Sequence, residues 1–541
     1  MSNNYKEKQW VADLGDGTYK NPILYTDYSD PDAIRVGDDY FMTASTFCNA
    51  PGLPILHSRD LVNWRVINYA IKQIPEKIYE RPVHGCGVWA PAIRYHEGTY
   101  YIFFPMPDEG IYVTTTKDPW GAWSKPHCLY SVSGWIDPCP FWDEDGRCYM
   151  ISAYAKSRIG FKSILRLTEI TPDCTKIIDM GKDVFDGNLE NQETIEGPKM
   201  YKRNGYYYIF APAGGVKQGW QTVLRSKNIW GPYEYKNVLF QKDTPVNGPH
   251  QGAWVDTQTG EDWFLHFQDV YAAGRIVHLQ PMKWLDNDWP VIGEYEEGEE
   301  SGKPVLVHKK PNVGAAYDIV CPESADDFDT DTLGLQWQWN ANWKSDWYTM
   351  HPEKSCIRLF AAHKEPETSI SNTSNLLIQK WSMPEFESIA RMDISQMKQG
   401  DIAGFISLGE LYTALSVEYG KEGKVLKVLK GRQSYDGQTC YAADEKETVA
   451  AIEGSEIFFK MTVKRIPSTQ ENSDGPYTFP VPREQAALYY SVDGNNYKQA
   501  YNFVPTAGRW VGAKFGIYCC HEGIGESGYV DIDYVKVVAN S

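Results

Sequence analysis

The 541-residue sequence lacks the features that mark a membrane protein or a nucleic-acid-binding protein. No run of about 18 apolar residues is present, so no transmembrane helix is expected. Basic residues are outnumbered, because 53 Lys and Arg stand against 71 Asp and Glu, for a net charge of −18. Nucleic acids and anionic membranes bind basic surfaces, so neither is an expected partner. The N-terminal residues also lack the apolar segment of a signal peptide. A neutral polar substrate such as a sugar is compatible with this charge balance.

The 11 cysteines form no recognisable metal or disulfide pattern. Their number is odd, they are scattered from Cys48 to Cys520, and no Cys-x-x-Cys pair or Cys/His zinc spacing occurs. This usage predicts mostly buried free thiols and favours a reducing, cytoplasmic location.

Aromatic residues are abundant, at 14% of the chain, and they recur in a regular pattern. Five short aromatic, β-branched runs each follow a turn that contains Gly or Asp, which is typical of a strand entered from a hairpin. Their marker residues are 61, 48, 58 and 56 positions apart: Tyr40, Tyr101, Tyr149, Tyr207 and Trp263.

Two further signals repeat with these runs. The strand before each turn opens at Asp30-Pro31, Ala90-Pro91, Asp137-Pro138, Gly197-Pro198 and, less regularly, Pro249-His250. Turns between outer strands are expected at 59–64, 117–123 and 227–233. Five units of about four strands without a long helix predict an all-β fold, a five-bladed β-propeller over residues 1–310. A single large β-sandwich would not explain the repeat.

The repeat is lost in the C-terminal part of the chain. An acidic, Gly-containing stretch at 294–302, followed by 303–313 with its two prolines, is typical of a linker. Non-repeating strand patterns over residues 311–541 predict a β-sandwich. Paired acidic motifs near its two ends, 326–329 and 531–534, are as typical of solvated turns as of a calcium site.

Three acidic residues stand at equivalent places in the repeats. Asp30 and Asp137 directly precede proline, and Glu196 precedes Gly197-Pro198. Because the innermost strand of each blade starts near the propeller axis, the three side chains are expected to converge. Crowded like charges cost stability, and one carboxyl group in such a cluster stays protonated near neutral pH. Two carboxylates flanking a bond, one acid and one base, are the minimal equipment for glycoside hydrolysis.

Other residues are expected at the same end of the propeller. Phe47 and Trp89 are candidates to stack on a sugar ring. Arg275 is a candidate substrate clamp, because a guanidinium forms charge-assisted hydrogen bonds. His250, in the fifth repeat, is expected to project into the axial channel, where it could hold a water molecule or a cation.

The motifs resemble those of glycoside hydrolase family 43, in order and at fitting spacings. The C-terminal part likewise resembles the concanavalin-like sandwich, a jelly roll, appended to the β-xylosidases of this family. The segments that carry the resemblance are Asn21-Pro22, 30–40, 51–64, Trp89-Ala90-Pro91, Ile136-Asp137-Pro138 and Glu196-Gly197-Pro198.

The resemblance implies a role for each candidate residue. Asp30 matches the general base, Glu196 the general acid and Asp137 the acid that tunes and orients the donor. The other matches are Arg275 for substrate binding, Trp89 and Phe47 for the pocket walls, and His250 for the axial histidine, often near a bound cation. The chain departs from the common pattern at 48–50, where bulkier residues are usual, and at Lys199, where His is common.

These observations predict an inverting, exo-acting glycoside hydrolase that releases terminal β-1,4-linked D-xylose from xylo-oligosaccharides or arabinoxylan fragments. The alternatives are an α-L-arabinofuranosidase, a non-catalytic carbohydrate-binding propeller and, less favoured, a retaining fructosidase. No cofactor is expected for the chemistry. Structural Ca²⁺ or Na⁺ near His250 and in the sandwich, an oligosaccharide partner and a homo-oligomer are further expectations. The sandwich is expected to complete the pocket wall.

Overall fold

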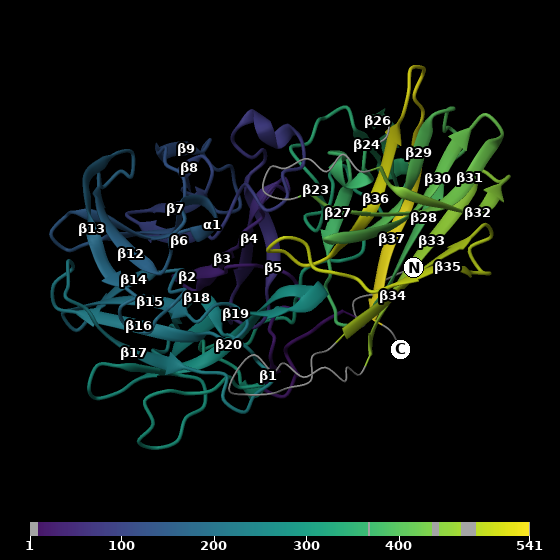
Figure 1. Cartoon of the computed structure of the whole chain (residues 1–541). Coiled ribbons are helices and arrows are strands. Elements are labelled where there is room, and N and C mark those ends of the chain that lie inside the picture. Colours follow the sequence, from purple (N-terminus) through teal and green to yellow (C-terminus); the bar gives the residue numbers. More distant parts are fainter. Residues whose placement is uncertain (1–8, 366–367, 435–442, 467–482, 540–541) are drawn as a thin grey trace.

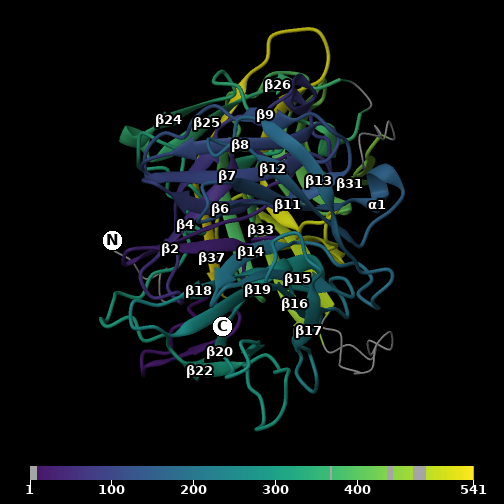
Figure 2. The same ribbon diagram turned by 90° about the vertical axis from the view of Figure 1, so that its left-hand side faces the viewer.

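The computed structural model describes residues 9–365, 368–434, 443–466 and 483–539. The N-terminal part contains five four-stranded antiparallel sheets, and the C-terminal part contains two larger sheets. Figure 1 shows the first part, purple to teal, beside the second, green to yellow, and Figure 2 views the molecule from the propeller side. The predicted five-bladed propeller followed by a sandwich is therefore confirmed.

Each blade uses four consecutive strands, paired in sequence order. Blade 1 comprises β2 (Asp32–Val36), β3 (Asp39–Thr43), β4 (Gly52–Ser58) and β5 (Arg65–Ile71). Blade 2 comprises β6 (Ala92–His96), β7 (Thr99–Met106), β8 (Gly110–Thr116) and β9 (His127–Tyr130). Blade 3 comprises β10 (Trp135–Trp142), β11 (Cys148–Tyr154), β12 (Ile164–Ile170) and β13 (Ile177–Asp186). Blade 4 comprises β14 (Lys199–Arg203), β15 (Tyr206–Ala213), β16 (Trp220–Ser226) and β17 (Glu234–Leu239). Blade 5 comprises β18 (His250–Asp256), β19 (Asp262–Val270), β20 (Gly274–Trp284) and β21 (Pro290–Ile292).

The predicted hairpins and outer turns agree with these strands. All five aromatic runs lie in the second strand of a blade, which pairs with the strand before it. The turns expected at 59–64, 117–123 and 227–233 connect the third and fourth strands of blades 1, 2 and 4. The repeat was visible in the sequence because each hairpin needs the same turn chemistry.

Ion pairs connect neighbouring blades. Arg94 of blade 2 donates to Asp32 of blade 1 at 2.6 Å, and Lys202 of blade 4 lies 2.6 Å from Asp143 of blade 3. The Asp32 side chain is fully buried, so its charge requires this partner. Such ion pairs connect the sheets of adjacent blades.

The propeller ends are joined by a strand pair that the sequence did not indicate. β1 (Thr18–Lys20) pairs antiparallel with β22 (Val307–Lys309), within the stretch predicted as a linker. That part of the linker prediction was wrong, because the partner strand lies far away in the sequence and leaves no local pattern. The predicted domain boundary at residues 310 and 311 follows β22 directly and stays a prediction.

The C-terminal part is a sandwich of two sheets. One sheet contains β23 (Gln338–Trp339), β27 (Leu377–Lys380), β36 (Lys514–His521), β29 (Asp401–Leu408), β30 (Leu411–Gly420), β31 (Gly423–Arg432) and β32 (Glu445–Ile452), with β26 (Ala362–His363) beside β36. The other contains β24 (Tyr348–His351), β25 (Cys356–Phe360), β37 (Tyr529–Ala539), β28 (Phe386–Asp393), β33 (Glu456–Ile466), β34 (Arg483–Ser491) and β35 (Lys498–Phe503).

Helices are few and short in the described part of the chain. They are α1 (Lys156–Ile159) and the 3-10 turns η2 (Lys77–Glu80), η3 (Tyr271–Ala273), η4 (Pro352–Lys354) and η5 (Ile370–Asn372). None of the described helices has the length and apolar character needed to cross a membrane. The ten described cysteines are free thiols, most of them buried, as predicted; Cys440 lies outside the described residues.

Propeller and sandwich share one hydrophobic core. Tyr25, Val270 and Ile276 of the propeller belong to the same buried cluster as Trp337 and Trp339 of the sandwich. The backbones also touch across this boundary, because Ala50 and Trp339 exchange N–H···O bonds of 3.1 and 2.6 Å. The two domains therefore pack as one body at this interface.

Candidate active site

The three predicted acids stand where the inner strands of the blades begin. Asp30 and Asp137 both have a φ of 56°, in the left-handed region that non-glycine residues rarely adopt. At Asp137 the pairing of β10 with β11 shifts register between Ile136 and Cys139, so the carboxylate bulges out of the ladder. Strained backbone of this kind is characteristic of functional sites.

In blades 4 and 5, Glu196 and His250 stand one residue before the left-handed position. The backbone explains this offset. Gly197, with a φ of 60°, and Gln251, with a φ of 35°, occupy the left-handed position there. A Cβ on Gly197 would lie 2.3 Å from the Gln251 side chain, so only glycine fits. Glu196 and His250 directly precede these residues and hold equivalent places.

Asp30 is buried and accepts three hydrogen bonds. Its Oδ1 accepts from Arg275 Nη1 at 2.9 Å, and its Oδ2 accepts from the hydroxyls of Ser29 at 2.8 Å and Ser45 at 2.6 Å. An ionised carboxylate accepts all three donors, whereas a protonated one would lose acceptor capacity. The surroundings of Asp30 therefore suit a base.

Asp137 has the opposite environment. Burial, reinforced by the charge of Glu196, raises the pKa of Asp137 to about 7. The Gly197 N–H donates to its Oδ2 at 2.7 Å, and the charge of Lys199 also acts to lower this pKa, but both effects are smaller than burial. Lys199, the departure noted in the sequence, is itself buried and donates to the Pro91 carbonyl at 3.2 Å. Asp137 and Glu196 thus form a carboxyl pair that retains a proton near neutral pH.

Glu196 is the most accessible of the three acids. Its side chain is 26% exposed, whereas the His250 side chain beside it is 1% exposed. His250 Nε2 lies 2.9 Å from Glu196 Oε1, and His250 Nδ1 has no hydrogen-bond partner among the described residues. A neutral imidazole that donates from Nε2 keeps a lone pair on Nδ1.

The three acids line a single cavity of about 540 Å³, together with Phe47, Trp89 and Arg275. The Phe47 and Trp89 rings lie 6.1 Å apart between centroids, and Trp89 donates from its indole to the Gly85 carbonyl at 3.1 Å. Six of the seven predicted site residues therefore meet in one place. The seventh, His250, lies behind Glu196 and does not line the cavity.

The sandwich contributes residues to the same cavity that the sequence did not indicate. Arg509 and Trp510 line it, and the Trp510 ring packs edge-on against Trp89 at 6.4 Å. The sandwich therefore completes the pocket wall, as predicted, but no sequence pattern identified these side chains. Ser29 and Ser45 were also missed, although Ser29 adjoins Asp30 in the sequence.

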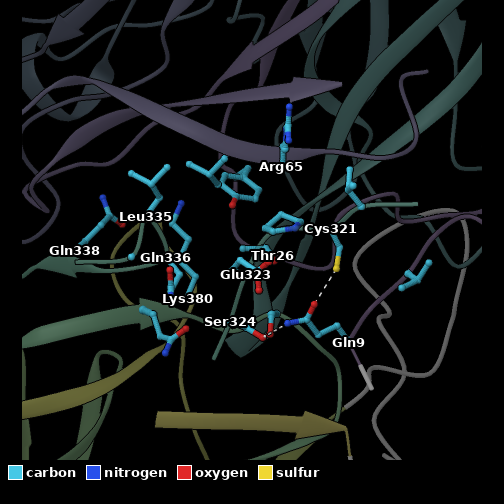
Figure 3. Close-up of a pocket in the computed structure, with 18 of the residues that line it drawn as sticks. Gln9, Thr26, Arg65, Cys321, Glu323, Ser324, Leu335, Gln336, Gln338 and Lys380 are labelled. Carbon is cyan, nitrogen blue, oxygen red and sulfur yellow. Dashed lines mark hydrogen bonds between the residues drawn. The ribbon is translucent and has the colours of Figure 1, made fainter. Parts of the chain in front are cut away.

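A second cavity, of about 490 Å³, lies between the propeller, the 319–324 connection and the sandwich (Figure 3). Its walls carry polar groups such as Gln9, which donates to Ser324 Oγ at 3.1 Å. Glu323 is the one carboxylate among its described lining residues. A single carboxylate cannot supply both an acid and a base, so the chemistry is assigned to the first cavity.

Metal ligands are sparse in the structure. The described residues contain no group of three or more His, Cys, Asp or Glu side chains arranged to hold a metal ion. In the sandwich, Asp531 instead pairs with Arg358 through two contacts of 2.8 and 2.9 Å, and Asp326 accepts from the Trp337 indole at 2.9 Å. The Ca²⁺ or Na⁺ sites expected near His250 and in the sandwich stay predictions.

A propeller that gathers three carboxyl groups around one cavity, beside the rings of Phe47, Trp89 and Trp510, has the equipment of a glycoside hydrolase. Sequence comparison gives the same result, because residues 19–290 match the model of glycosyl hydrolases family 43. Residues 325–538 match the beta xylosidase C-terminal concanavalin A-like domain. The chain belongs to glycosyl hydrolases family 43.

Individual relatives agree with this assignment. A Xylanibacter ruminicola protein, provisionally described as a beta-xylosidase, is 38% identical to this chain. The alignment covers 94% of this chain and 87% of the relative. A non-reducing end alpha-L-arabinofuranosidase of Bacteroides ovatus is 31% identical, in an alignment that covers 65% of this chain and 66% of the relative. The crystal structure of a family 43 protein mutant from Bacillus licheniformis has a TM-score of 0.78 at 27% identity, covering 97% and 100% of the two chains.

Proposed function

We propose that the protein is an inverting, exo-acting β-xylosidase that releases terminal β-1,4-linked D-xylose from xylo-oligosaccharides or arabinoxylan fragments. The observation that carries the proposal is the pair of contrasting carboxyl environments in one cavity. Asp30 faces three hydrogen-bond donors, whereas burial and the charge of Glu196 raise the pKa of Asp137 to about 7. A hydrolase needs one base and one acid, and these environments supply one of each.

In the proposed mechanism Asp30 deprotonates a water molecule while Glu196 protonates the leaving glycosidic oxygen. Glu196 suits the acid role because it is the accessible member of the carboxyl pair and because His250 holds its Oε1. In the chemical step the proton of the carboxyl pair resides on Glu196, because an ionised Asp137 favours a protonated neighbour. Asp137 also accepts the backbone N–H of Gly197 and so orients the donor. Arg275 orients Asp30 and contacts the sugar at the bottom of the cavity.

Placement on blades 1 and 4 predicts inversion. Carboxyl groups about 6.5–9.5 Å apart leave room for the attacking water, and no covalent intermediate forms. Proton NMR of the first product distinguishes the outcomes: a β-xyloside should release α-xylose first. Release of β-xylose, or a trapped glycosyl adduct on Asp30, would make the enzyme retaining.

The proposed exo action rests on the part of the cavity wall that the sandwich supplies. Trp510 and Arg509 of the sandwich stand on its wall, so a chain end fits but a continuing polysaccharide does not. A xylose residue can pack against the aromatic wall that Phe47, Trp89 and Trp510 form. We therefore expect oligosaccharides to be shortened by one xylose at a time from the non-reducing end.

Action on α-L-arabinofuranosides is the second candidate, favoured by the similarity to the Bacteroides ovatus arabinofuranosidase. Both sugars present a similar pentose outline to a cavity of this kind. A panel of nitrophenyl pentosides separates the two activities. Higher kcat/KM on the β-D-xyloside supports the proposal, and higher kcat/KM on the α-L-arabinofuranoside contradicts it.

A cation at His250 is part of the proposal. The unpartnered Nδ1 of His250 fits one ligand position, with water molecules as the remaining ligands. A bound cation would supply positive charge beside the acid pair. The His250 ring would then present Nε2–H to Glu196. Calorimetric titration of the chelator-treated protein with Ca²⁺, with His250→Ala as control, tests this site.

A further inference from the structure

The buried carboxylate of Asp27 lies behind the catalytic cavity and joins two segments that line it. Its Oδ1 accepts the backbone N–H of Arg275 at 2.9 Å, and its Oδ2 accepts the backbone N–H of Gly512 at 2.9 Å. Arg275 belongs to β20 of blade 5, and Gly512 follows Trp510 closely in a loop of the sandwich. One side chain therefore contacts the main chain beside two walls of the sugar pocket.

The sandwich also holds the main chain of Asp27. Lys380, at the end of β27 and on the wall of the second cavity (Figure 3), donates from Nζ to the Asp27 carbonyl at 2.7 Å. The same ammonium group lies 4.5 Å from the centre of the Tyr28 ring. Because these contacts are buried, little water can replace them when they break.

Blade 5 and the sandwich loop are in direct backbone contact at this point. A Cβ on Gly274, whose φ is 77°, would lie 2.5 Å from the Cα of Gly512. The next residue of the loop, Ala513, donates its N–H to the Ala272 carbonyl at 2.7 Å. A shift of the 508–513 loop is therefore transmitted to the start of β20, where Arg275 lies.

We infer that Asp27 is a positioning residue that sets the sugar affinity of the pocket. By accepting from Arg275 and Gly512 at once, it holds the Arg275 and Trp510 walls in a fixed relation. The two domains then form one binding site. This inference rests on the proposed function for the choice of sugar. Asp27 touches neither the sugar nor the reacting atoms, so it acts through Arg275 and Trp510.

The test is the Asp27→Asn variant, which has nearly the same volume. Its amide can accept one of the two N–H groups but presents an NH₂ donor to the other. Hydrogen bonds to charged groups are worth about ten- to a hundredfold in an equilibrium constant. We expect KM for nitrophenyl β-D-xyloside and Kd for xylose, measured by calorimetry, to rise about tenfold, with kcat within about threefold.

Asn342→Ala is the matched control. Asn342 of the sandwich bonds across the same domain interface, accepting from Ile74 N at 2.7 Å and donating to Ile74 O at 2.9 Å, away from the catalytic cavity. Its loss loosens the interface without touching Asp27, so KM and Kd should stay at wild-type values. Equal rises in both variants would mean that Asp27 only stabilises the interface, which overturns the inference.

A double variant tests whether Asp27 affects the sugar affinity through the loop that carries Trp510. If Asp27 acts through Arg275 and through the 508–513 loop, the loss of xylose affinity in Asp27→Asn combined with Trp510→Ala should be smaller than the sum of the two single losses. Additive losses would overturn the inference. A crystal structure of Asp27→Asn gives a result that does not depend on the sugar: the Arg275 and Gly512 main chains should separate. Unmoved main chains would overturn the inference even if the enzyme is a xylosidase, whereas wild-type inactivity on xylosides would overturn only the proposed function.

Discussion

The propeller places its functional groups by repetition, whereas the sandwich places its groups through one loop. Asp30, Asp137 and Glu196 come from three blades, and each stands near the start of an inner strand, at a left-handed residue or directly before one. Trp510 and its neighbour Arg509 come from one connection between β35 and β36. The pocket thus has three carboxyl groups that the repeats place, and an indole ring and a guanidinium that one loop of the sandwich places.

The propeller therefore supplies the catalytic groups, whereas the sandwich contributes to substrate binding. The propeller holds every carboxylate of the cavity, so it can supply acid and base by itself. The sandwich adds an aromatic wall and, through the shared core, the packing that supports the propeller. Removing the sandwich should therefore affect folding, removing an acid should affect turnover, and removing Trp510 should affect binding.

The largest effect is expected from deleting residues 322–541. The deletion exposes Tyr25, Val270 and Ile276, which pack in the core shared with the sandwich, and contiguous apolar surface of this kind promotes aggregation. We expect an insoluble or inactive fragment, measured by the soluble yield and by xyloside hydrolysis. A soluble, fully active 1–321 fragment would show that the propeller needs neither the shared core nor the aromatic wall.

The next largest effect is expected for Glu196→Gln. General acid catalysis contributes about 10²–10⁴-fold, so turnover of xylobiose should fall by that factor. The loss should be smallest for activated aryl xylosides, whose leaving group needs no proton. Removal of the Glu196 charge should also lower the pKa of Asp137, a shift measurable by infrared spectroscopy of the carboxyl band. An unchanged rate on xylobiose would remove Glu196 from the mechanism.

The features that repeat from blade to blade were the ones that the sequence could predict. The five hairpins and the convergence of Asp30, Asp137 and Glu196 followed from the spacing of similar segments. Even the offset of Glu196 has a simple cause, because Gly197 occupies the left-handed position that aspartate occupies in blades 1 and 3.

Features without a repeat were missed. β22 pairs with β1 across most of the propeller sequence, and nothing in the local composition indicates that partner. Trp510 reaches the cavity because the sandwich packs where Ala50 meets Trp339, and a single-sequence pattern carries no information on such packing. The neighbours that distinguish Asp30 from Asp137, such as Ser45 and Lys199, likewise became evident only from the fold.

A smaller effect is expected for Trp510→Ala. An aromatic contact contributes about 0.5–1.5 kcal/mol beyond its buried area, so KM for xylobiose should rise by about three- to tenfold. The value of kcat should change little, because the three acids stay in place. Trp510→Phe should recover most of the affinity. If kcat falls instead of KM rising, the sandwich takes part in the chemical step. The assignment of catalysis to the propeller and of binding to the sandwich would then be wrong.

A separate effect, on stability and not on catalysis, is expected in the pH dependence of unfolding, which tests the carboxyl groups of the pocket alone. The folded pKa of Asp137, about 7, lies above its ordinary value of 3.8. The native state therefore binds more protons than the unfolded chain between about pH 4 and 7, and stability falls as the pH rises through this window. A pKa shift of about three units corresponds to a loss of unfolding free energy of at most about 4 kcal/mol.

Asp137→Asn removes this dependence, so the variant should have a higher Tm than the wild type at pH 8 and lose that advantage at pH 4. Trp510→Ala, which leaves the acids in place, should show the same Tm difference from wild type at both pH values. A constant Tm difference for Asp137→Asn as well would mean that Asp137 is ionised throughout this pH range, so that its pKa is not raised in the folded state.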